Sequence, residues 1–246
     1  VFLSRKDQKA LDRELPVRSI MQMDDDSIQA FVKANQEENA KFTKWRTLRG
    51  LDDEEADRIL NDTESRKRCL RSRCAYRDKR CGRPPLAAKC RAVAIGCNDP
   101  DLPFLKRSAP TVSKLAFFVV LQVFASGLLD PLGAWTLGSG DVESAFLQGR
   151  RQTEGRKGPL YIWPPRDPIT SKAGTWPNKL YEVIGNMYGF ADAPLIFSYV
   201  VRERMYSAGF VSHSLDIMCF LYFVEGVLLC ICICLLYTSP SPRDPT

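Results

Sequence analysis

The stretch DVESAFLQG, residues 141–149, says more about fold and chemistry than any other part of this 246-residue chain. It begins with a carboxylate, Asp141, and continues through small residues to the aromatic Phe146. A carboxylate at a strand end with a shaped pocket above it suits Mg²⁺, which prefers carboxylate oxygens together with substrate phosphates. The pattern alone leaves a simpler interpretation open, because an Asp before an apolar run commonly serves as a cap or turn residue.

Basic residues are concentrated in one segment upstream of this stretch. The net charge of the whole chain is +6, yet residues 64–91 alone carry eleven Lys and Arg against Glu64 and Asp78. Such a cluster attracts phosphate-rich partners, although a solvated basic face has the same composition. With 45% apolar residues and ordinary Gly and Pro contents, the chain is neither collagen-like nor wholly disordered.

The nine cysteines favour a reducing compartment. Their number is odd and no signal-peptide pattern opens the sequence, so we expect an intracellular protein of the cytoplasm or nucleus that is not secreted. The five cysteines within residues 69–97 contain no C-x₂-C knuckle and lie far from the single histidine, His213, which disfavours zinc there. Cys230, Cys232 and Cys234 alternate with isoleucines, a pattern more typical of a strand than of a ligand set.

The hydropathy pattern predicts an α+β fold. Residues 1–62 have apolar positions at irregular helical spacing and are expected to form a charged, helical appendage with little core of its own. Beyond them, strands and helices alternate without the regular spacing of βαβ units, which disfavours a doubly wound sheet. The expected elements are strands at 70–77, 89–95 and 160–163, a helix at 114–126 that is apolar nearly all round and therefore buried, and a helix at 194–207.

The apolar stretch at residues 217–237 allows two interpretations. It holds a single charge, Glu225, over 21 residues, which meets the length criterion for a membrane span. However, Glu225 and Gly226 supply turn chemistry between β-branched and aromatic residues. We therefore favour a buried hairpin with strands at 218–224 and 227–233 over a single membrane span.

Four short strings follow one another along the chain: KCRAV at 89–93, PT at 110–111, DVESAFLQG at 141–149 and YGFADAP at 188–194. Their order and spacing resemble the reverse transcriptase domain of copia-type LTR retrotransposons, which typically reads K-x-R-x-V, P-T, D-V-x-x-A-F-L-x-G and then Y-G-L with a proline four residues on. The resemblance covers about residues 66–233. It implies the fingers and partial palm of a right-hand polymerase over residues 64–233, preceded by a helical N-terminal segment at 1–63.

The resemblance also implies roles in RNA-directed DNA synthesis. Asp141 would bind both catalytic Mg²⁺ ions, assisted by the backbone carbonyl of Val142, in a two-metal phosphoryl transfer. The ring of Phe146 would exclude a ribose 2′-hydroxyl, although ordinary core packing is an equally simple role for it. Lys79 and Arg91 would neutralise the incoming triphosphate, the arginine being the better candidate because its planar fork suits phosphate.

Further positions follow from the same resemblance. Tyr188 and Gly189 would line the nucleotide and template pocket, where glycine permits close backbone approach. The implied partners are an RNA template, a DNA primer, deoxynucleoside triphosphates and other segments of a Pol polyprotein, with no membrane. The residues expected to hold the nucleic-acid backbone are Arg66, Lys67, Arg68, Arg71, Arg73 and Arg77.

The family pattern fails at one decisive place. The family carries an aspartate pair soon after the strand that corresponds to residues 227–233, and no such pair follows here. Residues 234–244, CLLYTSPSPRD, instead resemble the translated read-through of a sequencing-library adapter, so residues 234–246 are expected to be an artefactual or disordered tail. The two-metal site is then incomplete, and we expect a fragment without polymerase activity. The alternatives are a non-catalytic nucleic-acid-binding relic of a transposable element and a single-span membrane protein.

Overall fold

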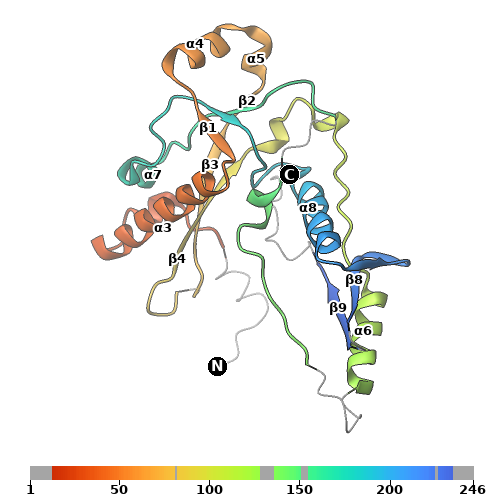
Figure 1. Ribbon diagram of the computed structural model, residues 1–246. Coiled ribbons are helices and arrows are strands. Elements are labelled where there is room, and N and C mark those ends of the chain that lie inside the picture. Colours follow the sequence, from red (N-terminus) through yellow and green to blue (C-terminus); the bar gives the residue numbers. More distant parts are fainter. Residues whose placement is uncertain (1–12, 81, 128–135, 151–154, 225–226, 235–246) are drawn as a thin grey trace.

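The computed structural model describes residues 13–80, 82–127, 136–150, 155–224 and 227–234. Within these residues, seven α-helices are interspersed with three separate β-sheets (Figure 1). This mixture is compatible with the predicted α+β class. The short connecting 3₁₀ turns are η1 (Gly96–Asn98), η2 (Leu102–Phe104) and η3 (Ala145–Gln148).

A two-stranded antiparallel ribbon, β3 (Ser72–Asp78) and β4 (Ala88–Ala94), confirms the hairpin predicted at 70–77 and 89–95. Residues 69–70 belong to a separate strand. Because side chains alternate along a strand, one face of the ribbon takes every second residue into the core. The buried side chains of this inner face are those of Cys74, Tyr76, Asp78, Cys90, Ala92 and Ala94.

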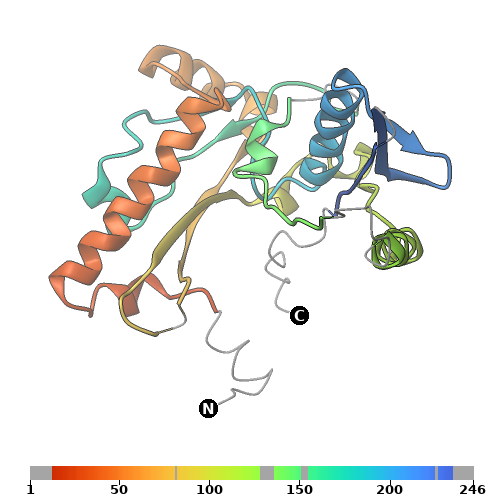
Figure 2. The ribbon, with the colours of Figure 1, turned by 60° about the horizontal axis from the view of Figure 1, so that its bottom comes forward.

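Helix α3 (Asp25–Lys44) covers the inner face of the ribbon, as Figure 2 shows. Asp24 caps the helix by accepting a hydrogen bond from the Ser27 backbone N–H at 2.8 Å. Phe31 packs edge-on against Tyr76 with ring centroids 6.0 Å apart, and both side chains are fully buried. The expectation that residues 1–62 form an appendage with little core is therefore wrong for this helix, because α3 contributes Ile28, Phe31, Val32, Ala34 and Phe42 to the core beneath the ribbon.

A polar network fastens α3 to the rest of this core. The Asn35 side-chain amide donates hydrogen bonds to the Tyr76 hydroxyl at 2.9 Å and to the Thr170 hydroxyl at 3.0 Å. Tyr76 in turn donates to Asp167, which caps helix α7 (Pro168–Ala173). Since buried polar groups must be hydrogen-bonded, this network fixes the register of helix, ribbon and α7 more closely than apolar contact alone.

A four-stranded sheet lies beside the ribbon. Its order is β1 (Leu48–Gly50), β6 (Tyr181–Val183), β5 (Tyr161–Ile162) and β2 (Cys69–Leu70), with β2 and β5 parallel and the other pairs antiparallel. Strand β5 confirms the strand predicted near residues 160–163. The helices near this sheet and at the start of the described chain are α4 (Asp53–Asn61), α5 (Thr63–Lys67) and α2 (Val17–Ile20).

The third sheet confirms the predicted hairpin at the apolar stretch. Strands β7 (Val211–His213), β8 (Asp216–Val224) and β9 (Val227–Cys232) form an antiparallel meander beside helix α8 (Ala193–Ser207). Phe197 of α8, Met218 and Phe220 make the core between helix and sheet. None of the described helices combines the length and apolar content that crossing a bilayer requires.

Helix α6 (Lys114–Gly127) does not behave as predicted. Ser113 caps it and receives a backbone N–H bond from Ala116 at 3.0 Å, while its own N–H donates to Asp216 of β8 at 2.6 Å. The helix packs against β8 on one narrow side and stands apart from the main core (Figure 2). The expected burial is therefore wrong: Leu115 is 74% exposed and Phe118 62% exposed. Exposed apolar surface of this kind is unusual in a monomeric protein.

The contrast between α3 and α6 predicts unequal effects of the same substitution. Phe31→Ala removes a fully buried ring, so we expect the free energy of unfolding to fall by about 3–5 kcal/mol. Phe118→Ala removes a largely exposed ring and should change it by less than about 1 kcal/mol. Urea denaturation followed by circular dichroism measures both. Equal losses would mean that α6 is as well packed as α3, against this structure.

Candidate nucleic-acid interface

The outer face of the β3/β4 ribbon is strongly basic. By the strand register, Arg77 lies directly opposite Lys89, Arg91 lies opposite Ala75, and Arg73 lies opposite Val93. Directly opposed residues share a face, so four cations lie on the side of the ribbon away from α3. We call the side chains of Arg73, Arg77, Lys89 and Arg91, all half-buried, the basic face.

Like charges on this face repel one another. Burial lowers the pKa of Lys89 below its usual value, and the charges of Arg91, Lys79 and Lys41 lower it further. Directly opposed like charges destabilise a sheet, so the Arg77–Lys89 pair opposes folding of the ribbon. A polyanion bound across the basic face would relieve this repulsion.

Aromatic side chains continue the basic face toward α8. The Arg91 guanidinium lies over the Tyr188 ring, 5.6 Å from its centroid. The Tyr188 ring lies 6.0 Å from that of Phe146, which in turn lies 6.3 Å from Phe197 of α8. Burial, together with the nearby Glu38 carboxylate, raises the pKa of Tyr188 to about 12, so its phenol is protonated at neutral pH. Three of the predicted site residues, Arg91, Phe146 and Tyr188, thus come together from segments far apart in the sequence.

Close backbone contact holds Tyr188 at the edge of β4. The Ala94 N–H donates to the Tyr188 carbonyl at 2.8 Å, and Gly189 follows with a φ of +95°. A Cβ at Gly189 would lie 2.0 Å from the Ala94 carbonyl oxygen, so only glycine fits. The chain's own strand β4 therefore requires glycine at this position, and the expected place of Gly189 beside a nucleotide or template stays a prediction.

A buried carboxylate that the sequence analysis did not single out lies behind the basic face. Glu38 of α3 is 3% exposed; its Oε2 accepts a hydrogen bond from Lys41 Nζ at 3.2 Å, whereas Oε1 has no hydrogen-bond partner among the described residues. Burial raises the pKa of Glu38, against the charges of Lys41 and Arg91. The burial of Glu38 could have been predicted from helical periodicity, because Glu38 lies one turn before Phe42 on the side of α3 that faces the ribbon.

Residues 141–149 do not form the expected strand end. Asp141 is exposed in a segment without helix or strand, and Val142 is 50% exposed. Ser144 then takes a left-handed φ of +54° and turns the chain into η3, which carries Phe146 inward. The motif is therefore divided between an exposed carboxylate and a packed aromatic ring.

The described residues do not fit the magnesium centre implied by the resemblance. Among the described residues, Asp141 does not belong to any group of three His, Cys, Asp or Glu side chains that lie close enough together to hold a metal ion. Two-metal catalysis requires several oxygen ligands around one pair of ions. We therefore derive no catalytic step through Asp141.

The remaining predicted phosphate ligands are dispersed. Arg66, Lys67 and Arg71 are exposed before the start of β3, and Lys79 is exposed just beyond its end. Arg73 is paired with Glu14. The prediction for Arg68 is wrong: its guanidinium is held by the buried Asp101 and by the carbonyls of Gly158 and Pro159.

Buried ion pairs organise the loops behind Tyr188. Arg156 donates to Asp99 at 2.7 Å and to both oxygens of Asp192 at 2.8 and 2.9 Å, and all three side chains are at most 7% exposed. Arg156 also lies over the Phe190 ring, 5.4 Å from its centroid. A second ion pair joins Arg68 to Asp101. Burial tends to raise the pKa of Asp101, but the hydrogen bonds and charge of Arg68 outweigh burial and lower this pKa.

This network joins η1, the segment before β5 and the start of α8. The structural roles of Asp99, Arg156 and Asp192 were not predicted from the sequence, although Asp192 lies within the YGFADAP string. Their pairing links positions that no local pattern connects.

Comparison with known proteins assigns no family or function to this chain. No protein-family model, curated protein or solved structure matches the chain.

The buried network predicts a large loss from one charge deletion. Arg156→Met leaves Asp99 and Asp192 buried without their cation, so we expect the free energy of unfolding to fall by about 3–5 kcal/mol. Lys179→Met removes a cation from an exposed pair with Asp57 and should cost less than about 1 kcal/mol. Urea denaturation at neutral pH compares the two variants. A loss for Arg156→Met no larger than for Lys179→Met would contradict the role given to the network.

Proposed function

We propose that this chain is part of a copia-type reverse transcriptase and that, as it stands, it binds nucleic acid through the β3/β4 ribbon without synthesising DNA. The parent activity is RNA-directed DNA synthesis by two-metal phosphoryl transfer. The partners proposed for this chain are an RNA template paired with a DNA primer.

The observation that carries the proposal is the meeting of Arg91, Tyr188 and Phe146. Each residue belongs to a different family-like string, at 89–93, 188–194 and 141–149. In the structure the guanidinium lies over one ring, and that ring neighbours the other. If the three strings resembled the family only by chance, there would be no reason for Arg91, Tyr188 and Phe146 to lie together in the fold.

The chemistry of this surface suits a phosphate backbone. Arg77, Lys89 and Arg91 lie close together on one face, and an arginine guanidinium donates paired N–H hydrogen bonds to phosphate oxygens. None of these contacts distinguishes one base from another, so the binding is independent of sequence. Its strength depends on released counterions and falls steeply with salt.

The proposal assigns no catalysis to this chain. Phosphoryl transfer by two metals needs carboxylates converging on one point, whereas Asp141 is exposed in an irregular segment. The ribbon and the aromatic rings need only the core and the buried ion pairs to keep their arrangement. The chain can therefore bind nucleic acid without the carboxylates that DNA synthesis would require.

Nucleic-acid binding is tested with a double variant. Lys89→Gln/Arg91→Gln removes two cations from the basic face, so we expect at least tenfold weaker binding of a labelled RNA–DNA primer–template. The slope of log K against log salt should fall by about 2. Fluorescence anisotropy of the full chain across a salt series measures both quantities.

The matched control removes the same charge elsewhere. Lys33→Gln/Lys172→Gln alters exposed lysines on α3 and α7, away from the basic face. It should weaken binding by less than about threefold, because these lysines act only through net charge. Equal losses in the two double variants would mean that no particular face of the protein binds the nucleic acid.

Loss of synthesis is tested separately. With Mg²⁺, deoxynucleotides and a primed RNA template, we expect the full chain to extend no primer, whereas an active reverse transcriptase run in parallel does. The products are resolved on a denaturing gel. Extension that disappears in Asp141→Asn would overturn the assignment of an inactive fragment.

A further inference from the structure

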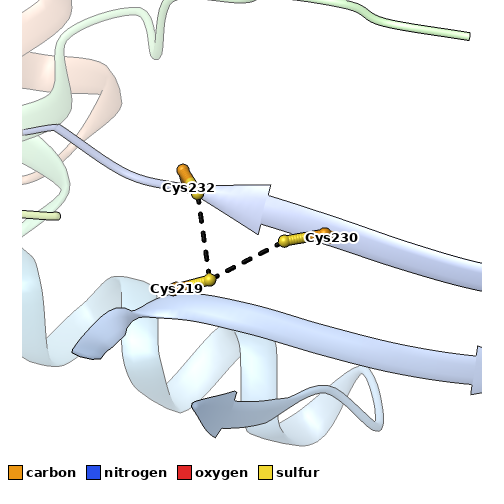
Figure 3. Close-up of side chains that lie close together, drawn as sticks. All are labelled: Cys219, Cys230 and Cys232. Carbon is orange, nitrogen blue, oxygen red and sulfur yellow. Dashed lines mark hydrogen bonds between the residues drawn. The ribbon is translucent and has the colours of Figure 1, made fainter. Parts of the chain in front are cut away.

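Three thiols lie together on one face of the β8/β9 hairpin. The Sγ atom of Cys219 lies 3.7 Å from that of Cys230 and 3.8 Å from that of Cys232, and all three sulfurs are within 4.8 Å of one another (Figure 3). The strand register explains the cluster, because Cys219 is directly opposite Cys232, and Leu221 is opposite Cys230. Cys219, Leu221, Cys230 and Cys232 therefore share one face.

The cluster is shielded but remains accessible. Cys219 is 4% exposed, whereas Cys230 and Cys232 are half-buried. Burial raises the pKa of Cys230 to about 11 and raises that of Cys232 as well. Weak S–H···S contacts join the thiol of Cys219 to those of Cys230 and Cys232.

Two of the three sulfur separations match those of a tetrahedral thiolate site. With a metal–sulfur distance of about 2.3 Å and tetrahedral angles, two ligand sulfurs lie about 3.8 Å apart. A disulfide would bring two of them to about 2.05 Å and leave the third unused. Both separations from Cys219 agree with the first geometry, and the third pair of sulfurs lies within 4.8 Å.

We propose that Cys219, Cys230 and Cys232 form a three-thiolate site for Zn²⁺ that joins the two strands of the β8/β9 hairpin. The cation replaces the thiol protons: three S–H bonds are lost, three S–Zn bonds form, and the protons pass to solvent. The fourth position of the tetrahedron is left for water or another donor. The alternation of cysteine and isoleucine in β9 places both its ligands on the face that Cys219 shares. This site does not depend on the proposed nucleic-acid function.

The reduced, metal-free full chain is titrated with Cd²⁺, whose complexes with thiolates have a charge-transfer absorption band. The bound Cd²⁺ is then displaced with Zn²⁺. We expect one ion per chain, an affinity that rises steeply with pH, and a higher Tm with Zn²⁺. Cys230→Ser and Cys232→Ser should each weaken Zn²⁺ binding more than tenfold and abolish the gain in Tm. Both alter half-buried positions, and circular dichroism verifies that the variants are folded.

The control is Cys97→Ser, which removes an exposed thiol on η1 outside the cluster. It should bind Zn²⁺ as the unaltered chain does. The proposal is overturned if the chain takes up no stoichiometric metal, or if Cys97→Ser loses as much affinity as the cluster variants. It is also overturned if the folded Cys230→Ser and Cys232→Ser variants keep full affinity.

Discussion

The arrangement around Tyr188 depends on one buried guanidinium. Arg156 lies between Asp99 and Asp192, so a charge is withdrawn from water together with two counter-charges. Burying ions is costly, and the cost is offset only while the geometry of the pairs is kept. The loops that contribute these residues therefore cannot shift independently. This constraint fixes the chain between β6 and α8, which includes Tyr188 and Gly189.

The basic face is tolerated because stability comes from the other side of the ribbon. Arg77 and Lys89 repel each other across the strands, whereas Tyr76, Cys90 and Ala92 on the inner face are buried against α3. The same helix carries the buried carboxyl group of Glu38, whose pKa is raised by burial and lowered by the charges of Lys41 and Arg91. The repulsion on the basic face lowers the stability of the ribbon, and burial of the inner face against α3 offsets it. Binding surfaces commonly depend in this way on a stable scaffold.

Two hairpins were predictable from the sequence, and tertiary pairing was not. Turn residues identified the hairpin at 218–233, because Glu225 and Gly226 lie between β-branched and aromatic residues. The short strands β1, β6 and β7 were not predicted. The apolar residues of α6 indicated burial, but hydropathy does not state whether a partner surface exists, and in the described residues most of that surface is exposed. The same limit hid the packing of α3 and the Arg156 network, whose members are joined only in the folded chain. Cys219 and Cys232 became neighbours only once the hairpin register was known.

Phe146 is fixed by packing, whereas Asp141 in the same DVESAFLQG stretch is exposed. Its ring packs against the core that contains α3 and the ribbon and also against the core that contains Phe197 and the β7–β9 sheet. A residue shared by two cores is constrained by packing whether or not any nucleotide is bound. Asp141 has no such constraint, because it is exposed in an irregular segment. The aromatic end of DVESAFLQG is therefore held by the fold, whereas the acidic end is exposed and is not held by packing.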